Sequence, residues 1–488
     1  MRWRNLSLFV LVALAALAWA DFIVRRFSPE PAWADASGYF NSASLLSKGE
    51  FSAKLRVPAP LKDYYPYDVE PVGFHFDSTR SVLVPTYFVG LPLVLAAVHA
   101  FLSWNLASYA AVLGSAVCLL ACTYAVLRSI RIDRPLAAAA VVGLAWCPVF
   151  VFSSSQTYSD TVASAACALA AFCVVRDSRR GLLLAFIAGA SLGFAVLVRS
   201  TSCLLLPALL IFAPSWKRRL AVGAGCLPFV AVLMAYQHLA YGEATSSGYG
   251  ALSRLFEWHY VPSSLANYAF LLPAVLPICV MAPVGALWAG PSWSARLRMG
   301  FSVWAASFGA FYAFYSFTGH DWTSLRFIEP AFPALLALGC IGLEALAARL
   351  EGSFPRLKAR SIAALVLLAA AGCVGFFGHF ADPKVHDRGF VAARAWTREN
   401  LPGGALVVCE SFSGSIYFDT PNAVLRWDIT QKENIQKYLR VMWDAGQPVY
   451  SLVDEAELSN PELLRKVPGR WLKMADFGTA SAWRIERP

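Results

Sequence analysis

Long apolar runs alternate with short polar segments along most of this chain, and the basic residues gather in the polar segments. A run of about 17–25 predominantly apolar residues is long enough to cross a bilayer as a helix. The pattern therefore predicts an α-helical integral membrane protein over residues 1–381. From residue 382 to 488 the pattern becomes polar and mixed, which is typical of a small α/β domain.

Eleven spans account for the apolar runs: residues 6–24, 107–127, 135–152, 160–175, 181–197, 201–214, 220–236, 265–289, 299–317, 327–348 and 361–380. Loops rich in Lys and Arg stay on the cytoplasmic side of a membrane. The basic clusters all fall on one side if the N-terminus is cytoplasmic and residues 382–488 lie outside. We therefore predict a multi-pass protein of the cell inner (plasma) membrane with an extracytoplasmic C-terminal domain.

This topology depends on the apolar run at residues 81–104. It contains Pro85, Gly90 and Pro92, which suit a broken helix in the outer interface better than a regular span. If the run crossed the membrane, most of the later basic clusters would lie outside. We predict the interfacial arrangement, so that residues 28–104 form a large first outer loop with interfacial helices.

The first apolar run has features of both a signal peptide and a span. Arg2 and Arg4 precede it, and Ala18-Trp19-Ala20 is similar to a signal-peptidase site. The run nevertheless continues to Val24, long enough to cross the bilayer. We expect an uncleaved first helix, and both alternatives place the next segment outside.

The composition supports a membrane protein and excludes several other classes. Charged residues make up 15% of the chain, whereas soluble domains contain about 25%. The net charge of +10 comes from loop clusters, so we expect no nucleic-acid partner. All of the 11 cysteines except Cys409 lie in apolar runs, which leaves no disulfide framework in the C-terminal domain.

Within the C-terminal domain the pattern predicts a helix over 389–400, strands over 405–409 and 423–427, a helix over 432–444 and a strand over 448–453. It carries no Gly-rich phosphate loop and no catalytic signature.

A polar segment after the first span carries the first candidate site. Asp35, Tyr39 and Ala43 are four residues apart, and the segment ends at Gly49. On a helix these three side chains share a face. A carboxylate on a helix along the bilayer surface could meet a lipid-linked substrate. The alternative is that Asp35 caps a helix in a solvated loop.

Further ionisable residues gather at the same predicted outer face: Arg80, Asp160, Arg199, His320 and Arg326. Charges at membrane depth are costly, so they normally pair or line a cavity. Acids and arginines at one interface could bind a lipid phosphate. The alternatives are that Asp160 caps a helix and that the arginines anchor to headgroups.

The motifs occur in a fixed order: D-x-x-x-Y-x-x-x-A from Asp35, then PTYFVGLPLVLA, an acid before a helix at Asp160, LVRSTSCLLLP around Arg199, and R-F-x-x-P-x-x-P from Arg326. This order resembles the polytopic, lipid-phosphate-sugar-dependent glycosyltransferases of the GT-C superfamily. The bacterial members similar to protein O-mannosyltransferases and to the aminoarabinose transferase of lipid A are the nearest in pattern. The resemblance covers nearly the whole chain, including SFSGSIYFDTPNAVLRWD in the C-terminal domain. The family often has two adjacent acids in the first motif, whereas Ala36 follows Asp35 here.

The resemblance implies that residues 1–381 form a catalytic membrane domain for inverting sugar transfer in the cell envelope. The donor would be a polyprenyl-phosphate-linked sugar, and the acceptor a lipid, glycan or protein. Asp35 would be the general base and Asp160 would orient acceptor or sugar. The implied substrate-binding residues are Arg80, Arg199, Arg326, Tyr39 and His320. No cofactor is expected, and the histidines lack the spacing of metal ligands.

Three alternatives remain at this point. A transporter or flippase of lipid-linked sugars would share the arginines but would not need Asp35. Another polyprenyl-phosphate enzyme, such as an O-antigen ligase or polymerase, would share the donor. A structural membrane protein with an outer interaction domain would need neither Asp35 nor a lipid-linked donor.

Overall fold

The computed structural model describes residues 17–176, 178–249, 255–288, 293–319, 321–354, 358–377 and 383–488. His320 lies outside these ranges. The chain divides into two compact units. The first unit contains residues 1–27, 109–232 and 251–381, and the second contains residues 28–108, 233–250 and 382–488. The predicted domains follow chain order, whereas the contacts group the first loop with the C-terminal residues.

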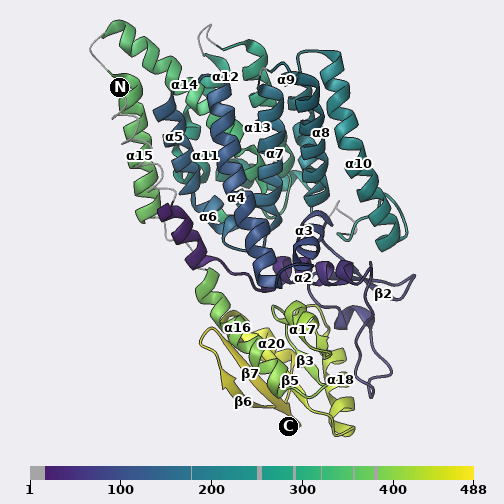
Figure 1. Ribbon diagram of the computed structural model, residues 1–488. Coiled ribbons are helices and arrows are strands. Elements are labelled where there is room, and N and C mark those ends of the chain that lie inside the picture. Colours follow the sequence, from purple (N-terminus) through teal and green to yellow (C-terminus); the bar gives the residue numbers. More distant parts are fainter. Residues whose placement is uncertain are drawn as a thin grey trace. The chain divides into compact units, whose positions relative to one another are not determined.

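The first unit is built from helices that run alongside one another (Figure 1). They are α4 (Trp104–Ser129), α5 (Arg134–Ala145), α6 (Pro148–Ser154), α7 (Ser159–Val175), α8 (Gly181–Val198), η2 (Ser200–Leu205), α9 (Leu206–Phe212), α10 (Trp216–Tyr241), η4 (Trp258–Tyr260), α11 (Val261–Val275), η5 (Pro277–Met281), α12 (Ala282–Leu287), α13 (Ala295–Ala313), η6 (Trp322–Ala331), α14 (Phe332–Ser353) and α15 (Ala359–Phe377). Residues 17–26 are also helical. The first residues of α4 and the last turns of α10 belong to the second unit.

Among the described residues, four helices are long and apolar enough to cross a membrane, or up to six if each of two bent pairs is one span. The pair α5 and α6 bends by 60°, and the pair from Trp258 to Leu287 bends by 117°. Pro148 and Pro277 begin the second half of each pair, because proline cannot supply the amide that would continue the helix. The chain is a helical multi-pass membrane protein. The count of eleven spans stays a prediction.

The segment at residues 81–104 differs from the predicted broken helix. Its first part is strand β2 (Val82–Pro85), which pairs antiparallel with β1 (Phe74–Asp77). Helix α3 covers only Gly90–His99. The prediction of helix over 81–85 is wrong because Val82 and Val84 are β-branched and favour a strand, and Pro85 is tolerated at its end.

The second unit contains a five-stranded sheet with the order β4-β3-β5-β7-β6 (Figure 1). The parallel strands are β3 (Leu406–Val408), β4 (Ala423–Leu425) and β5 (Val449–Asp454), and β6 (Arg470–Asp476) and β7 (Ala480–Glu486) run antiparallel. The helices are α16 (Pro383–Asn400), α17 (Ser413–Asp419), α18 (Lys432–Asp444), α19 (Glu455–Ser459) and α20 (Pro461–Lys466). One sheet face packs against α18 and α20, and the other against α16 and α17.

The first loop shares the core of this sheet. It contributes α2 (Trp33–Ser47), η1 (Pro66–Val69), β1, β2 and α3. Leu61 and Val69 lie in the same apolar cluster as α18. The Tyr438 hydroxyl donates to the buried Asp68 carboxylate at 2.8 Å. Residues 28–108 are therefore an integral part of the second unit.

Candidate active site

Helix α2 holds Asp35 in its first turn. The N-cap is Ala32, so Asp35 is not the cap that the alternative interpretation of the sequence required. A carboxylate in the first turn is stabilised by the helix dipole. The helix ends at Ser47, its C-cap is Lys48, and the expected stop Gly49 follows with a φ of 74° that suits glycine. The Gly49 and Glu50 amides donate to the Leu46 and Leu45 carbonyls at 3.0 and 2.9 Å, which closes a Schellman motif.

Tyr87 is a partner of Asp35 in the second unit, and the sequence did not point to it. Its hydroxyl forms a hydrogen bond with the Asp35 carboxylate. Burial and the negative charge of Asp35 raise the pKa of Tyr87 well above its ordinary value, so the phenol stays protonated and donates. The Tyr87 ring lies 5.0 Å from the ring of the buried Tyr39 and 6.0 Å from that of Tyr249.

Two glycines allow this close approach. A Cβ atom on Gly38 would lie 2.4 Å from Tyr87 Cε2, which is closer than atoms can come. Gly73 has a φ of 88°, and a Cβ atom there would lie 2.4 Å from the Gly38 Cα. Because Gly38 and Gly73 have no side chains, Tyr87 and the turn before β1 can lie against helix α2.

Arg80 is engaged by its own hairpin. Its Nε atom lies 2.7 Å from Asp77 Oδ2, and its guanidinium also reaches the Leu239 and Ala240 carbonyls. Burial opposes ionisation of Asp77, but hydrogen bonds from Thr79 and Arg80 outweigh it and lower the Asp77 pKa to about 2. The Arg80 side chain is one-third exposed at 33%. Through these contacts Arg80 stabilises the β1–β2 turn and joins it to the end of α10.

The first unit brings together three of the predicted residues. Asp160 is in the first turn of α7, Arg199 follows the last residue of α8, and Arg326 lies in η6. Arg199 forms an ion pair with Asp160, and Arg326 Nη1 lies 3.9 Å from the other Asp160 oxygen. The Asp160 side chain is only 3% exposed. Asp160 is therefore a buried carboxylate between two guanidinium groups, and the N-cap of α7 is Tyr158.

Aromatic rings flank both arginines. The Arg199 and Arg326 guanidinium carbons lie 5.6 and 5.1 Å from the centre of the Phe327 ring, and Arg326 lies 4.7 Å from that of Tyr158. Such contacts are favourable cation–π interactions. Arg199 Nη2 also lies 3.3 Å from the Tyr312 hydroxyl. These rings fix two planar cations next to each other.

A second acid, Glu329, was missed from the sequence. It lies one turn after Arg326 in η6 and is fully buried. Ser153 donates a hydrogen bond to Glu329, and Thr161 Oγ1 lies 3.1 Å from Ser153 Oγ. The rule that charges at membrane depth are costly, which identified Arg199, would also have identified Glu329 in RFIEPAF. Two acids and two arginines thus share this part of the first unit.

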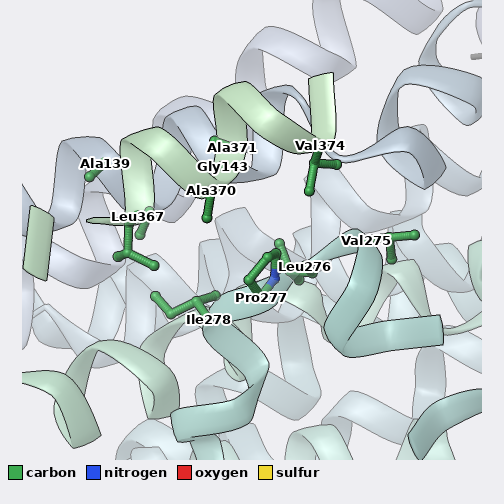
Figure 2. A pocket seen from close by; sticks show the side chains of 11 residues that line it. Ala139, Gly143, Val275, Leu276, Pro277, Ile278, Leu367, Ala370, Ala371 and Val374 are labelled. Atoms are coloured by element: carbon green, nitrogen blue, oxygen red, sulfur yellow. The ribbon is translucent and has the colours of Figure 1, made fainter. Parts of the chain in front are cut away.

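Neither a metal site nor the apolar pocket of the first unit adds to this chemistry in the described residues. Across the described part of the chain, no group of three or more His, Cys, Asp or Glu side chains is arranged to hold a metal ion. Figure 2 shows a pocket of the first unit that is lined by apolar residues of α5, of the α11–η5 bend and of α15. It contains no side chain able to transfer a proton or bind phosphate.

Comparison with known proteins identifies the fold. Neither a family model nor a curated protein sequence matches the chain. The crystal structure of ArnT from Cupriavidus metallidurans bound to undecaprenyl phosphate matches with a TM-score of 0.60 at 12% identity, over 98% of each chain. AglB, the oligosaccharyltransferase of Archaeoglobus fulgidus, in complex with an inhibitory peptide and a dolichol-phosphate, matches with a TM-score of 0.53 at 12% identity, over 98% of this chain and 74% of that one. Both are GT-C glycosyltransferases, and this chain has the GT-C fold.

Proposed function

We propose that this protein is an inverting glycosyltransferase that moves a sugar from a polyprenyl-phosphate donor to an acceptor on the outer side of the plasma membrane. The observation that carries the proposal is Asp35, a partly exposed carboxylate that a protonated tyrosine holds in the first turn of α2, in a chain of GT-C fold. The ArnT structure contains bound undecaprenyl phosphate and the AglB structure a dolichol-phosphate, which supports this class of donor.

Asp35 acts as the general base. The acceptor hydroxyl or amine attacks the anomeric carbon of the donor sugar, and Asp35 takes its proton. The bond between the anomeric carbon and the phosphate oxygen breaks, and its electron pair leaves with the polyprenyl phosphate. Attack opposite the leaving group inverts the anomeric configuration. Tyr87 orients the Asp35 carboxylate through its hydrogen bond.

Arg199 and Arg326 bind the phosphate and stabilise the charge that it gains as it leaves. A guanidinium group matches the geometry of phosphate oxygens and pairs with them bidentately. Asp160 holds both arginines in place until the phosphate arrives, and it orients acceptor or sugar. A lipid phosphate is a good leaving group, so donors of this kind supply much of the stabilisation that the reaction needs.

The test is transfer of a radiolabelled sugar by membranes supplied with candidate polyprenyl-phosphate sugars. Asp35→Asn keeps the shape of the side chain but cannot accept the proton. Asp21→Asn is the matched control, because Asp21 is an exposed carboxylate paired with Arg25. We expect transfer by the wild type and the control and none by Asp35→Asn at equal expression.

The flippase alternative predicts a different outcome. A flippase moves the lipid-linked sugar across the membrane without breaking a bond, and it has no need of a base at Asp35. Equal transfer by Asp35→Asn and wild type would therefore refute the proposed role of Asp35. Transbilayer movement of the donor without any transfer to an acceptor would refute the proposal that the protein is a glycosyltransferase.

A further inference from the structure

Helix α17 of the C-terminal residues packs directly against the helix that carries Asp35. The Asn41 side-chain amide donates to the Gly414 carbonyl at 2.8 Å and to the Ser37 carbonyl at 2.9 Å. The Ser37 and Asn41 side chains are buried. This contact joins residues 373 positions apart within the second unit.

Gly414 sets how closely the two helices approach. A Cβ atom at this position would lie 2.2 Å from Ser37 Oγ, 2.7 Å from Ser37 Cβ and 2.9 Å from the Val72 carbonyl oxygen. The backbone of Gly414 is an ordinary helical one, so glycine is required here for space rather than for its conformation. Any larger side chain must push α2, or the segment at Val72, away from α17.

The remaining contacts hold α17 in place from several sides. Ser413 Oγ accepts from the Val72 amide at 3.0 Å and donates to the Glu410 carbonyl at 2.6 Å. The Tyr417 hydroxyl donates to the Lys54 carbonyl at 2.9 Å, and the Arg56 guanidinium lies 3.6 Å from the centre of the Tyr417 ring. Because α17 is fixed in this way, an added side chain at Gly414 is expected to displace α2 rather than α17.

The two faces of α2 have different partners. Successive residues of a helix turn by about 100°, so Ser37 and Asn41 point nearly opposite to Asp35 and Tyr39. One face contacts Gly414, and the other contacts Tyr87. The position of α2 between these partners determines where the Asp35 carboxylate lies.

We propose that α17 is a positioning element for Asp35, with Gly414 and Asn41 as its positioning residues. This inference rests on the proposed role of Asp35 as general base. It assigns a function to the C-terminal residues: they build the support of the base from the side of α2 that faces away from the chemistry.

The experiment compares Gly414→Ala with Gly403→Ala in the full-length protein. A Cβ atom on Gly403 would meet nothing closer than Pro421 Cγ at 4.0 Å. A displacement of about 1 Å can reduce a rate about 100-fold. We expect Gly414→Ala to lower kcat about ten- to 100-fold, with the donor KM changed less than about twofold. We expect Gly403→Ala to behave as wild type.

A second measurement does not depend on activity. Hydrogen exchange over residues 33–47 should be faster in Gly414→Ala and unchanged in Gly403→Ala. Adding Ser37→Gly to Gly414→Ala removes the two nearest colliding atoms and should restore part of both kcat and protection. A loss that does not arise from the collision with Ser37 would not be relieved by this second substitution.

The outcomes separate the two proposals. Normal kcat and normal exchange in Gly414→Ala, beside an inactive Asp35→Asn, would overturn the positioning role alone. A rise in donor KM with unchanged exchange over 33–47 would also overturn it. Retained transfer by Asp35→Asn would overturn the role of Asp35, and the positioning of a base with it.

Discussion

Replacing Asp160 by asparagine removes the negative charge that lies between Arg199 and Arg326. Asparagine keeps the size of the side chain, so the substitution changes charge more than packing. The Asp160 side chain is 3% exposed, and those of Arg199 and Arg326 are 16% and 19% exposed. Breaking a buried ion pair by removing one partner costs about 3–5 kcal/mol, because the other charge is left uncompensated. We expect a loss of unfolding free energy in this range.

The assay is unfolding of the purified protein in detergent, followed as the fraction of a denaturing detergent increases. Asp21→Asn is the control, since the Asp21–Arg25 pair has side chains that are 60% and 77% exposed. Exposed pairs contribute less than about 1 kcal/mol. A double variant, Asp160→Asn with Arg199→Gln, should be destabilised by less than the sum of the single variants, because both charges of the Asp160–Arg199 ion pair are removed together.

The same variant tests the link to phosphate. Asp160→Asn takes away the carboxylate charge that pairs with both arginines, so added polyprenyl phosphate should raise the stability of this variant more than that of the wild type. A loss of less than about 1 kcal/mol, equal to that of Asp21→Asn, would refute the argument that this pair is buried and structurally coupled. Equal stabilisation of both proteins by the lipid would refute the exchange of carboxylate for phosphate.

Three further predictions concern other parts of the chain. Tyr87→Phe removes a hydrogen bond to a charged partner, which contributes about 1.5–3 kcal/mol, so kcat should fall about tenfold or more with the donor KM unchanged; a wild-type kcat would contradict this. Burial raises the pKa of Glu457 from 4.5 to about 7 despite its hydrogen bond from Trp427, so the folded protein binds the proton more tightly and local stability near β5 falls as pH rises between these values. Glu457→Gln should abolish that fall in hydrogen-exchange measurements at pH 5 and 8. A reporter fused after Lys384 should be found outside the membrane, and a cytoplasmic reporter would overturn the predicted topology.

The sequence predicts those elements in which apolar and polar side chains alternate regularly. The pattern predicts helix α18 over the residues observed, because Ile435, Tyr438, Leu439 and Met442 recur at helical spacing and are all buried. Strand β6 was not expected, since its side chains are mostly exposed or half-buried and show no alternation. Helix α17 has the sequence SGSIYFD, which carries no helix signal, and its contacts with α2 explain why it forms there.

The candidate sites show the same division. Arg199 was found because an arginine within a long apolar stretch is costly and needs a partner, and the structure supplies Asp160. Tyr87 was not found, since a tyrosine near a membrane interface is ordinary. Its hydrogen bond with Asp35 depends on the β1–β2 hairpin, which returns the chain to α2. A contact between residues far apart in the chain gives no periodic pattern in the sequence.

The contacts of helix α2 in the second unit determine which substitutions should impair the role of Asp35. Helix α2 is 15 residues long, and isolated helices shorter than about 12–15 residues are marginal in water. Its stability must therefore come from Tyr87, from Gly414 and from the core shared by the first loop and the sheet. The arginines of the first unit, by contrast, have Asp160 as a partner within their own unit. Substitutions in the C-terminal residues should thus impair the chemical step through Asp35, whereas substitutions of Arg199 should impair both the binding and the departure of the phosphate.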